Sequence, residues 1–372
     1  MKKMKLIILG TRGVPNNHGG FEQFAEYFSL YMVDKGHDVS VFNSHTHPYQ
    51  LEEWNGVKII HKKDPENNIG TAGQFIYDLN CVMHCRKEHY DIILQLGYTS
   101  SSVWSKLMPK TSLVITNMDG LEWKRSKYQK PVRKFLKYAE GLAIFNSDFL
   151  ISDSIGIQQY IRDAYKKEST YIAYGADVFE QPSETVLEQY KVKAGQYNML
   201  IARLEPENNI EVILDGVSAA KTKDLFLVIG KHDVNKFGAY LKEKYKDQKH
   251  IKFIGGVYNL NHLNNLRYYS KLYFHGHSVG GTNPSLLEAM ASGALIVAND
   301  NVFNKSILKG NALYFNNSTD VEHIIDNDSV YKKYKELYKS HNIDEINTNF
   351  NWNYINSQYE TFLMSKLYGN DF

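Results

Sequence analysis

Residues 275–297 have the residue types and the spacing of an anion-binding turn. They read HGHSVGGTNPSLLEAMASGALIV, so an apolar run leads through glycines and Asn-Pro into a helix-forming stretch and a second apolar run. Asn283 can cap a helix, and Pro284 suits its first position because proline has a fixed φ and no N–H. The free amides and the dipole of that first turn favour a phosphate, and Gly280 and Gly281 let the backbone approach it closely.

Glu288 lies about one turn into the same predicted helix. Its carboxylate would repel a phosphate directly beside it, so we place it on a neighbouring neutral diol such as the ribose of a nucleotide. The alternative for the whole segment is an ordinary strand–helix turn of a parallel sheet.

A second glycine-rich loop follows the first apolar run, in the sequence GTRGVPNNHGGFEQF. It brings Gly13, His18, Gly19 and Gly20 to the start of an amphipathic helix, where an open α/β sheet binds ligands. The loop lacks the GxGxxG pattern, so we infer no nicotinamide site. A long first loop without a ligand is the alternative.

Two polar residues follow predicted strands at positions that suit catalysis. Asp119 could accept the proton of an attacking hydroxyl, or it could simply cap its loop. Arg203 offers two donors in a fixed fork, which matches a pyrophosphate, with a surface salt bridge as the alternative. The acidic run at 326–328 is interpreted as a helix cap, and the sequence predicts no metal site.

The stretch 117–141 is both basic and aromatic. It interleaves Trp123, Tyr128, Phe135 and Tyr138 with Lys124, Arg125, Lys127, Lys130, Arg133, Lys134 and Lys137. Such a stretch can lie on an anionic membrane surface. A solvated helical face is the alternative.

Short apolar runs separated by helix-length amphipathic segments must position these residues. The runs at 5–9, 38–42, 57–61, 91–96, 112–116, 142–145 and 149–152 predict buried parallel strands, and the same alternation resumes with YNMLIAR, LFLVIG, IKFIG, KLYFHG and ALIVA after residue 195. The pattern predicts an α/β protein with two doubly wound halves.

We expect three parts along the chain. Residues 1–178 form the first domain, residues 196–350 form the second, and residues 351–372 form a terminal helix that packs back on the first. The polar stretch 176–196 contains the linker, and a cleft lies between the halves. A length of 372 residues suits two such cores.

The composition excludes several classes of protein. A formal net charge of +2 gives no global reason to expect nucleic acid as a partner. Cys81 and Cys85 are the only cysteines, which predicts neither a zinc site nor a disulfide framework and suits a reduced cytoplasmic chain. The short apolar run near the N-terminus predicts a strand and no signal peptide or membrane span.

These motifs resemble those of retaining glycosyltransferases of family 4, which have the GT-B fold of two Rossmann-like domains. The segments ARLEPENN and GGTNPSLLEAMASGALIV occupy the places of that family's second-domain signatures. GTRGVPNNHGGFEQF and NMDGLEWKRSK resemble the first domain of bacterial rhamnosyltransferases that extend capsule or wall polysaccharide.

The resemblance implies roles for particular residues. Glu288 would bind the nucleotide ribose, and Lys231 would lie near the donor. Arg203 would hold the diphosphate together with the turn formed by Gly280, Gly281, Thr282 and Asn283. The loop from Gly13 to Gly20 would approach the diphosphate and the acceptor, with His18, Gly19 and Gly20 on the acceptor side. Asp119 and Glu122 would also interact with the acceptor.

The chain departs from the family pattern at two positions. Gly280 stands where the family has its first Glu, and Asn208 stands where it has a phosphate-binding Lys. We expect Arg203, the helix amides and His275 or His277 to take over these contacts. A 6-deoxy sugar, which lacks the O6 hydroxyl, would need different contacts from those of the first Glu.

The resemblance therefore implies metal-independent transfer of L-rhamnose from dTDP-L-rhamnose to a lipid-diphosphate-linked saccharide, with retained configuration. The partners would be the nucleotide sugar, the lipid-linked acceptor and an anionic membrane surface. The enzyme would lie in the cytoplasm at the inner face of the membrane. The alternatives are an epimerase or hydrolase acting on nucleotide sugars, and a non-catalytic subunit that binds them.

Overall fold

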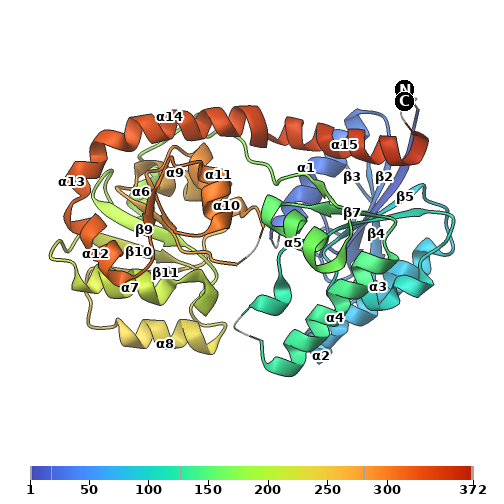
Figure 1. Cartoon of the computed structure of the whole chain (residues 1–372), viewed down its shortest axis with the longest axis horizontal. Coiled ribbons are helices and arrows are strands. Elements are labelled where there is room, and N and C mark those ends of the chain that lie inside the picture. The colour runs from blue at the N-terminus through green and yellow to red at the C-terminus, as the bar shows by residue number, and fades with distance from the viewer. Residues whose placement is uncertain (1, 18, 126–127, 280, 370–372) are drawn as a thin grey trace. The chain divides into compact units, whose positions relative to one another are not determined.

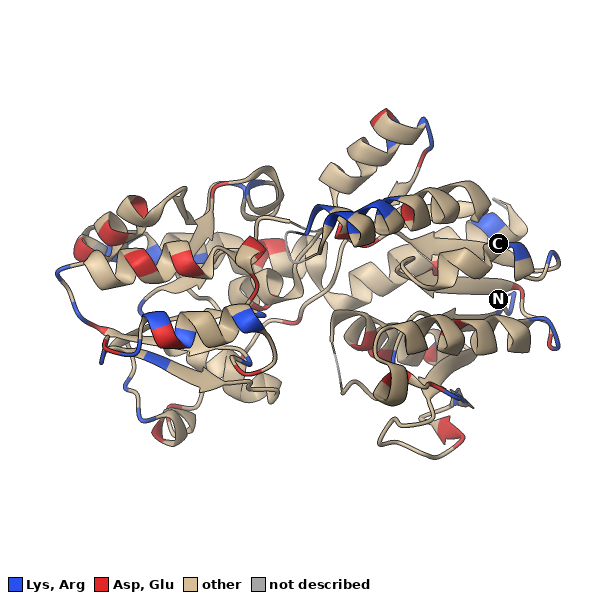
Figure 2. Cartoon of the chain, turned by 90° about the horizontal axis from the view of Figure 1, so that it is seen from below, with Lys and Arg blue, Asp and Glu red and all other residues tan. Residues whose placement is uncertain are grey.

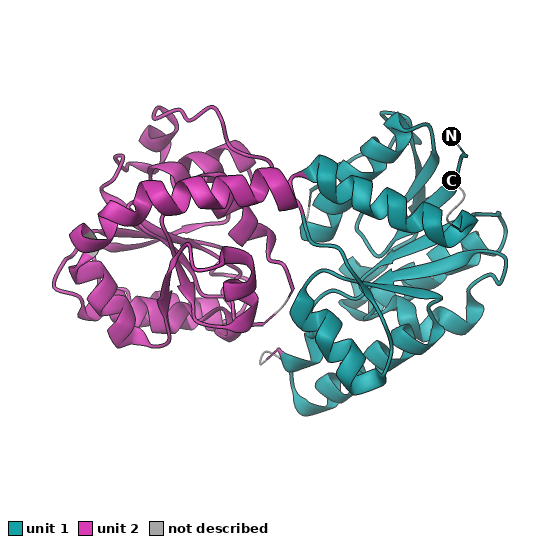
Figure 3. Cartoon of the chain, turned by 45° about the horizontal axis from the view of Figure 1, so that its top comes forward, with its two compact units in different colours: residues 1–124, 128–174, 352–372 teal, residues 125–127, 175–351 magenta. Residues whose placement is uncertain are grey.

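The computed structural model describes residues 2–17, 19–125, 128–279 and 281–369. The chain divides into two compact units (Figure 3). Unit 1 comprises residues 1–124, 128–174 and 352–372, and unit 2 comprises residues 125–127 and 175–351. Among the described residues, no helix combines the length and the hydrophobicity needed to span a membrane.

Unit 1 is built on an eight-stranded sheet with the order β3-β4-β2-β1-β5-β6-β7-β8. The strands are β1 (Lys5–Leu9), β2 (Asp38–Ser44), β3 (Glu53–Trp54), β4 (Val57–Lys62), β5 (Ile92–Leu96), β6 (Leu113–Asn117), β7 (Phe149–Ser152) and β8 (Thr170–Tyr171). Paired neighbours are parallel, except that the short β3 runs antiparallel to β4. Without the short edge strands, the order is that of a doubly wound domain, and it reverses between β1 and β5.

Helices pack on this sheet because its central strands are apolar on both faces. The helical segments of unit 1 are α1 (Gly20–Asp34), α2 (Glu66–Ile69), α3 (Ala72–Cys85), η1 (Ser101–Leu107), η2 (Glu122–Lys124), α4 (Lys130–Asn146), α5 (Ile155–Tyr165) and α15 (Trp352–Tyr368). The C-terminal α15 lies beside α1 (Figure 1). Aromatic rings join the two helices: the Phe24 and Tyr359 ring centres are 4.6 Å apart, and Tyr27 stacks on Trp352 at 4.5 Å.

Unit 2 has a six-stranded, fully parallel sheet with the order β11-β10-β9-β12-β13-β14. Its strands are β9 (Tyr197–Ile201), β10 (Leu225–Ile229), β11 (Ile251–Gly255), β12 (Tyr273–His275), β13 (Ile296–Asn299) and β14 (Leu313–Phe315). This is again the doubly wound order, with its reversal between β9 and β12. Ligands of such sheets bind outside the carboxyl ends of the strands at that reversal.

The helical segments of unit 2 cover both faces of its sheet. They are α6 (Val186–Tyr190), η3 (Pro206–Asn208), α7 (Ile210–Ala219), α8 (Lys236–Lys244), α9 (Leu260–Tyr269), α10 (Pro284–Ala291), α11 (Val302–Leu308), α12 (Ser318–Asp326), α13 (Asp328–Tyr331), η4 (Lys332–Tyr334), α14 (Lys335–Glu345) and η5 (Ile346–Phe350). One buried cluster joins the sheet residues Leu200, Phe226 and Phe274 to Ile213 of α7 and Val321 of α12.

The predicted α/β fold of two doubly wound, parallel-sheet domains is confirmed. One predicted strand is wrong, because residues 142–145 form the last turn of α4. Ala143 and Ile144 are buried whereas Phe145 is 60% exposed, so this apolar run follows the period of a helix. Strand β14 and the short edge strands β3 and β8 were not predicted from the sequence.

Candidate active site

The carboxyl edge of the unit 2 sheet gathers most of the predicted donor residues. Arg203 follows β9, Lys231 follows β10, and residues 281–283 lead from β12 into α10. Both cations are exposed to solvent. Lys231 places its Nζ 5.3 Å from the centre of the Tyr258 ring. Gly280 lies outside the described residues.

The start of α10 has the predicted cap. The Asn283 side chain accepts a hydrogen bond from the Ser285 amide at 2.9 Å, and Pro284 is the first helical residue. Thr282 is buried just before this cap. The first turn of α10 therefore presents its dipole at the reversal point of the sheet.

The loops after β9 and β12 are packed tightly together. A Cβ on Gly276 would lie 2.1 Å from the Asn208 carbonyl oxygen, so this contact requires glycine. The Asn209 side chain donates to the Gly276 carbonyl at 2.8 Å, and the Ser278 hydroxyl donates to the Glu207 carbonyl at 2.7 Å. Asn208 is buried and donates to the Arg203 carbonyl at 2.7 Å. Asn208 thus helps to hold the loop that carries Arg203.

Two histidines continue β12 toward the same edge. Their rings stack with centres 4.4 Å apart, and His275 is 1% exposed. Within the described residues, both ring nitrogens of His275 and Nδ1 of His277 have no hydrogen-bond partner. Burial lowers the pKa of both residues, with the nearby positive charge of Arg203 adding to the shift of His277, whose pKa falls to about 3. Both imidazoles are therefore neutral at physiological pH, so each carries one N–H donor.

Glu288 on α10 pairs with a buried arginine that was not among the residues predicted from the sequence. Arg267 of α9 is 1% exposed, and its Nη2 lies 2.6 Å from Glu288 Oε2. The Glu288 side chain keeps 16% of its surface exposed. The pair could not be read from local spacing, because α9 and α10 meet only through tertiary packing.

In unit 1 the glycine-rich loop after β1 is fixed by side chains from other strands. The Asn43 side chain of β2 exchanges hydrogen bonds with the amide and the carbonyl of Val14, at 3.0 and 2.8 Å. A Cβ on Gly13 would collide with the Asn43 side chain, so this glycine also has a packing role. Gly19 precedes α1 and Gly20 begins it, while His18 lies outside the described residues.

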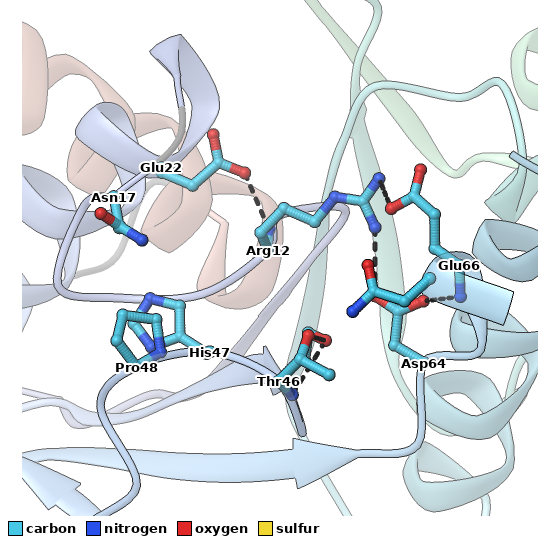
Figure 4. A pocket seen from close by; sticks show the side chains of 10 residues that line it. Arg12, Asn17, Glu22, Thr46, His47, Pro48, Asp64 and Glu66 are labelled. Carbon is cyan, nitrogen blue, oxygen red and sulfur yellow. Dashed lines mark hydrogen bonds and ion pairs between the residues drawn. The ribbon is translucent and has the colours of Figure 1, made fainter. Parts of the chain in front are cut away.

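The same loop forms one wall of an acidic pocket (Figure 4). Its lining includes Arg12, Glu22, His47, Asp64 and Glu66. Arg12 bonds Asp64 at 3.1 Å and also pairs with Glu66, so two carboxylates neutralise its charge. The Arg12 amide donates to Glu22 at 2.7 Å. Carboxylates that outnumber cations suit the hydroxyl groups of a sugar better than a phosphate.

Asp119 and Glu122 follow β6 at the carboxyl edge of the unit 1 sheet. Asp119 has φ of 49°, and its amide donates to the Asn117 side chain at 3.1 Å. The Glu122 amide donates to the Gly120 carbonyl at 2.9 Å. The Gly97 amide after β5 donates to the Asn117 carbonyl, so the ends of β5 and β6 are joined just before Asp119.

The described residues contain no cluster of three or more His, Cys, Asp or Glu side chains placed to hold a metal ion. Cys81 and Cys85 are both buried in α3, where burial raises the pKa of Cys85 to about 12. Neither thiol is poised to react.

Comparisons with known proteins agree with this geometry. Residues 188–341 match the family model "Glycosyl transferases group 1", and residues 3–177 match the model "Domain of unknown function (DUF1972)". No curated protein matches the sequence.

Several solved structures share the fold over nearly the whole chain. Sucrose-phosphate synthase from Thermosynechococcus elongatus has a TM-score of 0.80 at 15% identity, covering 98% of this chain and 99% of its own. HepE from Anabaena, in complex with UDP-glucose, has a TM-score of 0.75 at 15% identity, covering 97% and 99%. α,α-Trehalose 6-phosphate synthase from Burkholderia multivorans has a TM-score of 0.70 at 11% identity, covering 98% and 99%.

The fold is therefore GT-B, and unit 2 carries a domain of the glycosyl transferases group 1. The match of residues 188–341 to this family supports assignment to the glycosyltransferase class of enzymes.

Proposed function

We propose that this glycosyltransferase moves L-rhamnose from dTDP-L-rhamnose to a hydroxyl of a lipid-diphosphate-linked saccharide, with retention of configuration. The reaction would serve the synthesis of a bacterial surface polysaccharide at the inner face of the membrane.

The observation that carries the proposal is a capped helix start near an exposed arginine at the carboxyl edge of unit 2. The capped start of α10 and the exposed Arg203 lie at the reversal of the sheet, and Glu288 projects from the same helix one turn on. A nucleotide diphosphate matches this set, because its phosphates suit the cation and the helix start while its pentose suits a carboxylate. HepE, which shares the fold, was solved with UDP-glucose.

The same set provides a mechanism for breaking the bond to the sugar. Negative charge develops on the diphosphate as it leaves, and a preorganised donor at such a position contributes about 3 kcal/mol to transition-state stabilisation. Arg203 and the α10 amides would supply these donors, so we propose a reaction without a metal. The acceptor hydroxyl would attack from the face that the diphosphate leaves, and the departing phosphate would help to remove its proton.

The departures from the family pattern support a 6-deoxy donor. A glycine at position 280 offers no carboxylate for the O6 region of a sugar, and rhamnose has no hydroxyl there. The neutral imidazole of His277, next to Arg203, would offer an N–H to the donor without adding charge. Lys231 would also lie near the donor.

The acceptor would approach residues of unit 1. Asp119 and Glu122 stand at the carboxyl edge of that sheet, and Gly19 and Gly20 open α1 at the same edge. The acidic pocket in Figure 4 supports this assignment, because carboxylates such as those in its lining can accept hydrogen bonds from sugar hydroxyls.

The lipid part of the acceptor requires access to a membrane, and α4 has a suitable face. Figure 2 shows Lys and Arg gathered along this helix. Lys130 and Lys134 are exposed, and so are Tyr138 and Phe145, at 62% and 60%. The spacing of these four residues puts them on one side of the helix, which gives it cations beside aromatic rings, as at a membrane interface.

A donor screen read by mass spectrometry tests the proposal. The full chain is incubated in EDTA with dTDP-rhamnose, UDP-sugars or GDP-sugars and a GlcNAc-diphosphate-lipid acceptor. We expect a product heavier by one rhamnose with dTDP-rhamnose alone. Transfer from a different donor would overturn the rhamnose assignment, and a requirement for added divalent metal would overturn the metal-free mechanism.

A further inference from the structure

Glu140 of α4 is a carboxylate that is 1% exposed and accepts hydrogen bonds from several side chains. Its Oε1 accepts from Lys137 Nζ at 2.9 Å and from the hydroxyls of Tyr160 and Tyr165 at 2.6 and 2.7 Å. Its Oε2 accepts from the indole Nε1 of Trp123 at 2.9 Å. A buried charge is costly without such partners, so the fold must keep these donors in place.

The partners of Glu140 also pack on one another. Lys137 Nζ lies 4.6 to 4.8 Å from the ring centres of Trp123, Tyr160 and Tyr165. Lys137 belongs to α4, and both tyrosines belong to α5. Trp123 instead belongs to η2, in the segment that follows β6. The buried carboxylate therefore ties that segment to two long helices.

Helix α4 holds the segment 119–124 at further points. It packs against η2, and Arg133 Nε donates to the Trp123 carbonyl at 2.8 Å. The Tyr98 hydroxyl donates to the Gly120 carbonyl at 3.3 Å and lies 3.5 Å from Oε2 of the buried carboxylate. Both the main chain and the indole of the segment are thus anchored around one charged group.

We propose that Glu140 is a positioning residue, which orients the segment 119–124 through Trp123 and so sets the place of the Asp119 and Glu122 carboxylates. The inference rests on the proposed function, which assigns these two carboxylates to the acceptor. Because Glu140 is buried, it acts on the acceptor only through this segment.

Two substitutions each remove one donor from Glu140. Trp123→Phe removes the indole N–H and Tyr165→Phe removes a hydroxyl, and both keep an aromatic ring beside Lys137. We expect Trp123→Phe to lower kcat about tenfold, because it loses a hydrogen bond to a charged group. The Kd of the nucleotide, which is assigned to unit 2, should not change. Tyr165→Phe, the matched control, should keep the wild-type kcat, and an equal loss in both variants would contradict positioning through Trp123.

Glu140→Gln separates the hydrogen bond from the bulk of the indole. It replaces one acceptor oxygen by an amide donor and removes the charge that the surrounding donors share. We expect it to lower kcat by a similar factor, and adding Trp123→Phe should then have little further effect. A further loss of about tenfold in the double variant would show that Trp123 acts independently of Glu140, and would overturn the inference.

Amide hydrogen exchange, read by mass spectrometry, tests the positioning without any substrate. Peptides covering 119–124 should exchange about tenfold faster in Glu140→Gln and in Trp123→Phe than in the wild type, while Tyr165→Phe should not change them. Peptides of β1 and β2 are the reference within unit 1. Unchanged exchange at 119–124 in Glu140→Gln, or equal acceleration of the reference peptides, would overturn the inference.

The two measurements keep this inference apart from the proposed function. A wild-type chain that transfers no sugar with any donor and acceptor would overturn the proposed function, and hydrogen exchange would still decide whether Glu140 holds the segment. A wild-type chain that transfers sugar, with the same kcat in Glu140→Gln, would overturn the role of Glu140 alone.

Discussion

Arg203 is the residue on which the proposed chemistry depends most. Its side chain is exposed, while its carbonyl is held by the buried Asn208. We expect Arg203→Ala to lower kcat about 100-fold, because a lost donor to the leaving group costs about 3 kcal/mol. The melting temperature should not change, since an exposed side chain contributes little to stability. Steady-state assays that show wild-type turnover would remove Arg203 from the mechanism.

Asp119 allows a direct test of whether a carboxylate of unit 1 takes the proton of the acceptor hydroxyl. Its positive φ is one that asparagine tolerates well, so Asp119→Asn should keep the turn while removing the carboxylate. General base catalysis is worth about 100-fold or more, so we expect a loss of that size in kcat with an unchanged Kd for the nucleotide. A variant as active as the wild type would leave Asp119 as a turn residue.

Single residues of the site were predictable where local rules decide. Asn283 before Pro284 predicted the capped helix start, because capping depends on neighbours within one turn. The Arg267–Glu288 pair was not predictable, since the two side chains meet only when α9 packs beside α10. The stacking of His275 on His277 follows from their alternation along an extended strand. Only the structure shows that ring nitrogens of both histidines have no hydrogen-bond partner among the described residues.

At the scale of elements, α3 contains a titratable group that opposes folding at neutral pH. Asp78 is buried, the Ser100 hydroxyl donates to it at 2.5 Å, and burial raises its pKa to about 6 from the ordinary value of 3.8 for an aspartate. Between these values the folded chain keeps a proton that the unfolded chain releases. The free energy of unfolding therefore falls as pH rises through this window.

Asp78→Asn should remove this penalty and still accept the Ser100 bond. We expect the variant to exceed the wild type in free energy of unfolding by about 3 kcal/mol at pH 7.5, and the difference to vanish near pH 3. Urea denaturation across this range measures it. A variant less stable than the wild type at pH 7.5 would show that the charged form is stabilised by its surroundings.

Helix α4 and the short segment η2 before it should determine binding to membranes. Reversing Lys124, Lys130 and Lys134 to Glu should abolish sedimentation with anionic liposomes, because each cation near the surface contributes about 1 kcal/mol. Reversing the exposed Lys252, Lys332 and Lys333 of unit 2 makes the same change in net charge and should leave binding intact. Equal loss in both triple variants would show dependence on net charge alone.

Long buried strands were easier to predict than short strands or the end of a helix. Buried runs such as KLIIL and LFLVIG became β1 and β10, because a strand covered on both faces is continuously apolar. The run 142–145 has the same character but continues α4, and its four residues were too few to show a helical period. β14 has three residues, which are too few for its hydrophobic pattern to be distinguished from that of the neighbouring residues.

At the scale of the whole molecule, alternation of strands and helices was enough to predict two doubly wound units. Right-handed crossovers leave few other ways to connect such elements. Helix α15 belongs to unit 1, and Tyr359 and Trp352 give its physical basis in ring packing against α1. Substrate identity does not follow from this architecture, because many chemistries share one fold.

A proton NMR time course of the full chain with dTDP-rhamnose and the lipid-linked acceptor tests the central claim most directly. We expect the anomeric signal of the donor to be replaced by that of a rhamnoside with the same configuration, and we expect no reaction without the acceptor. Free rhamnose, a new nucleotide sugar, or binding without any change in the donor would contradict a retaining rhamnosyltransferase.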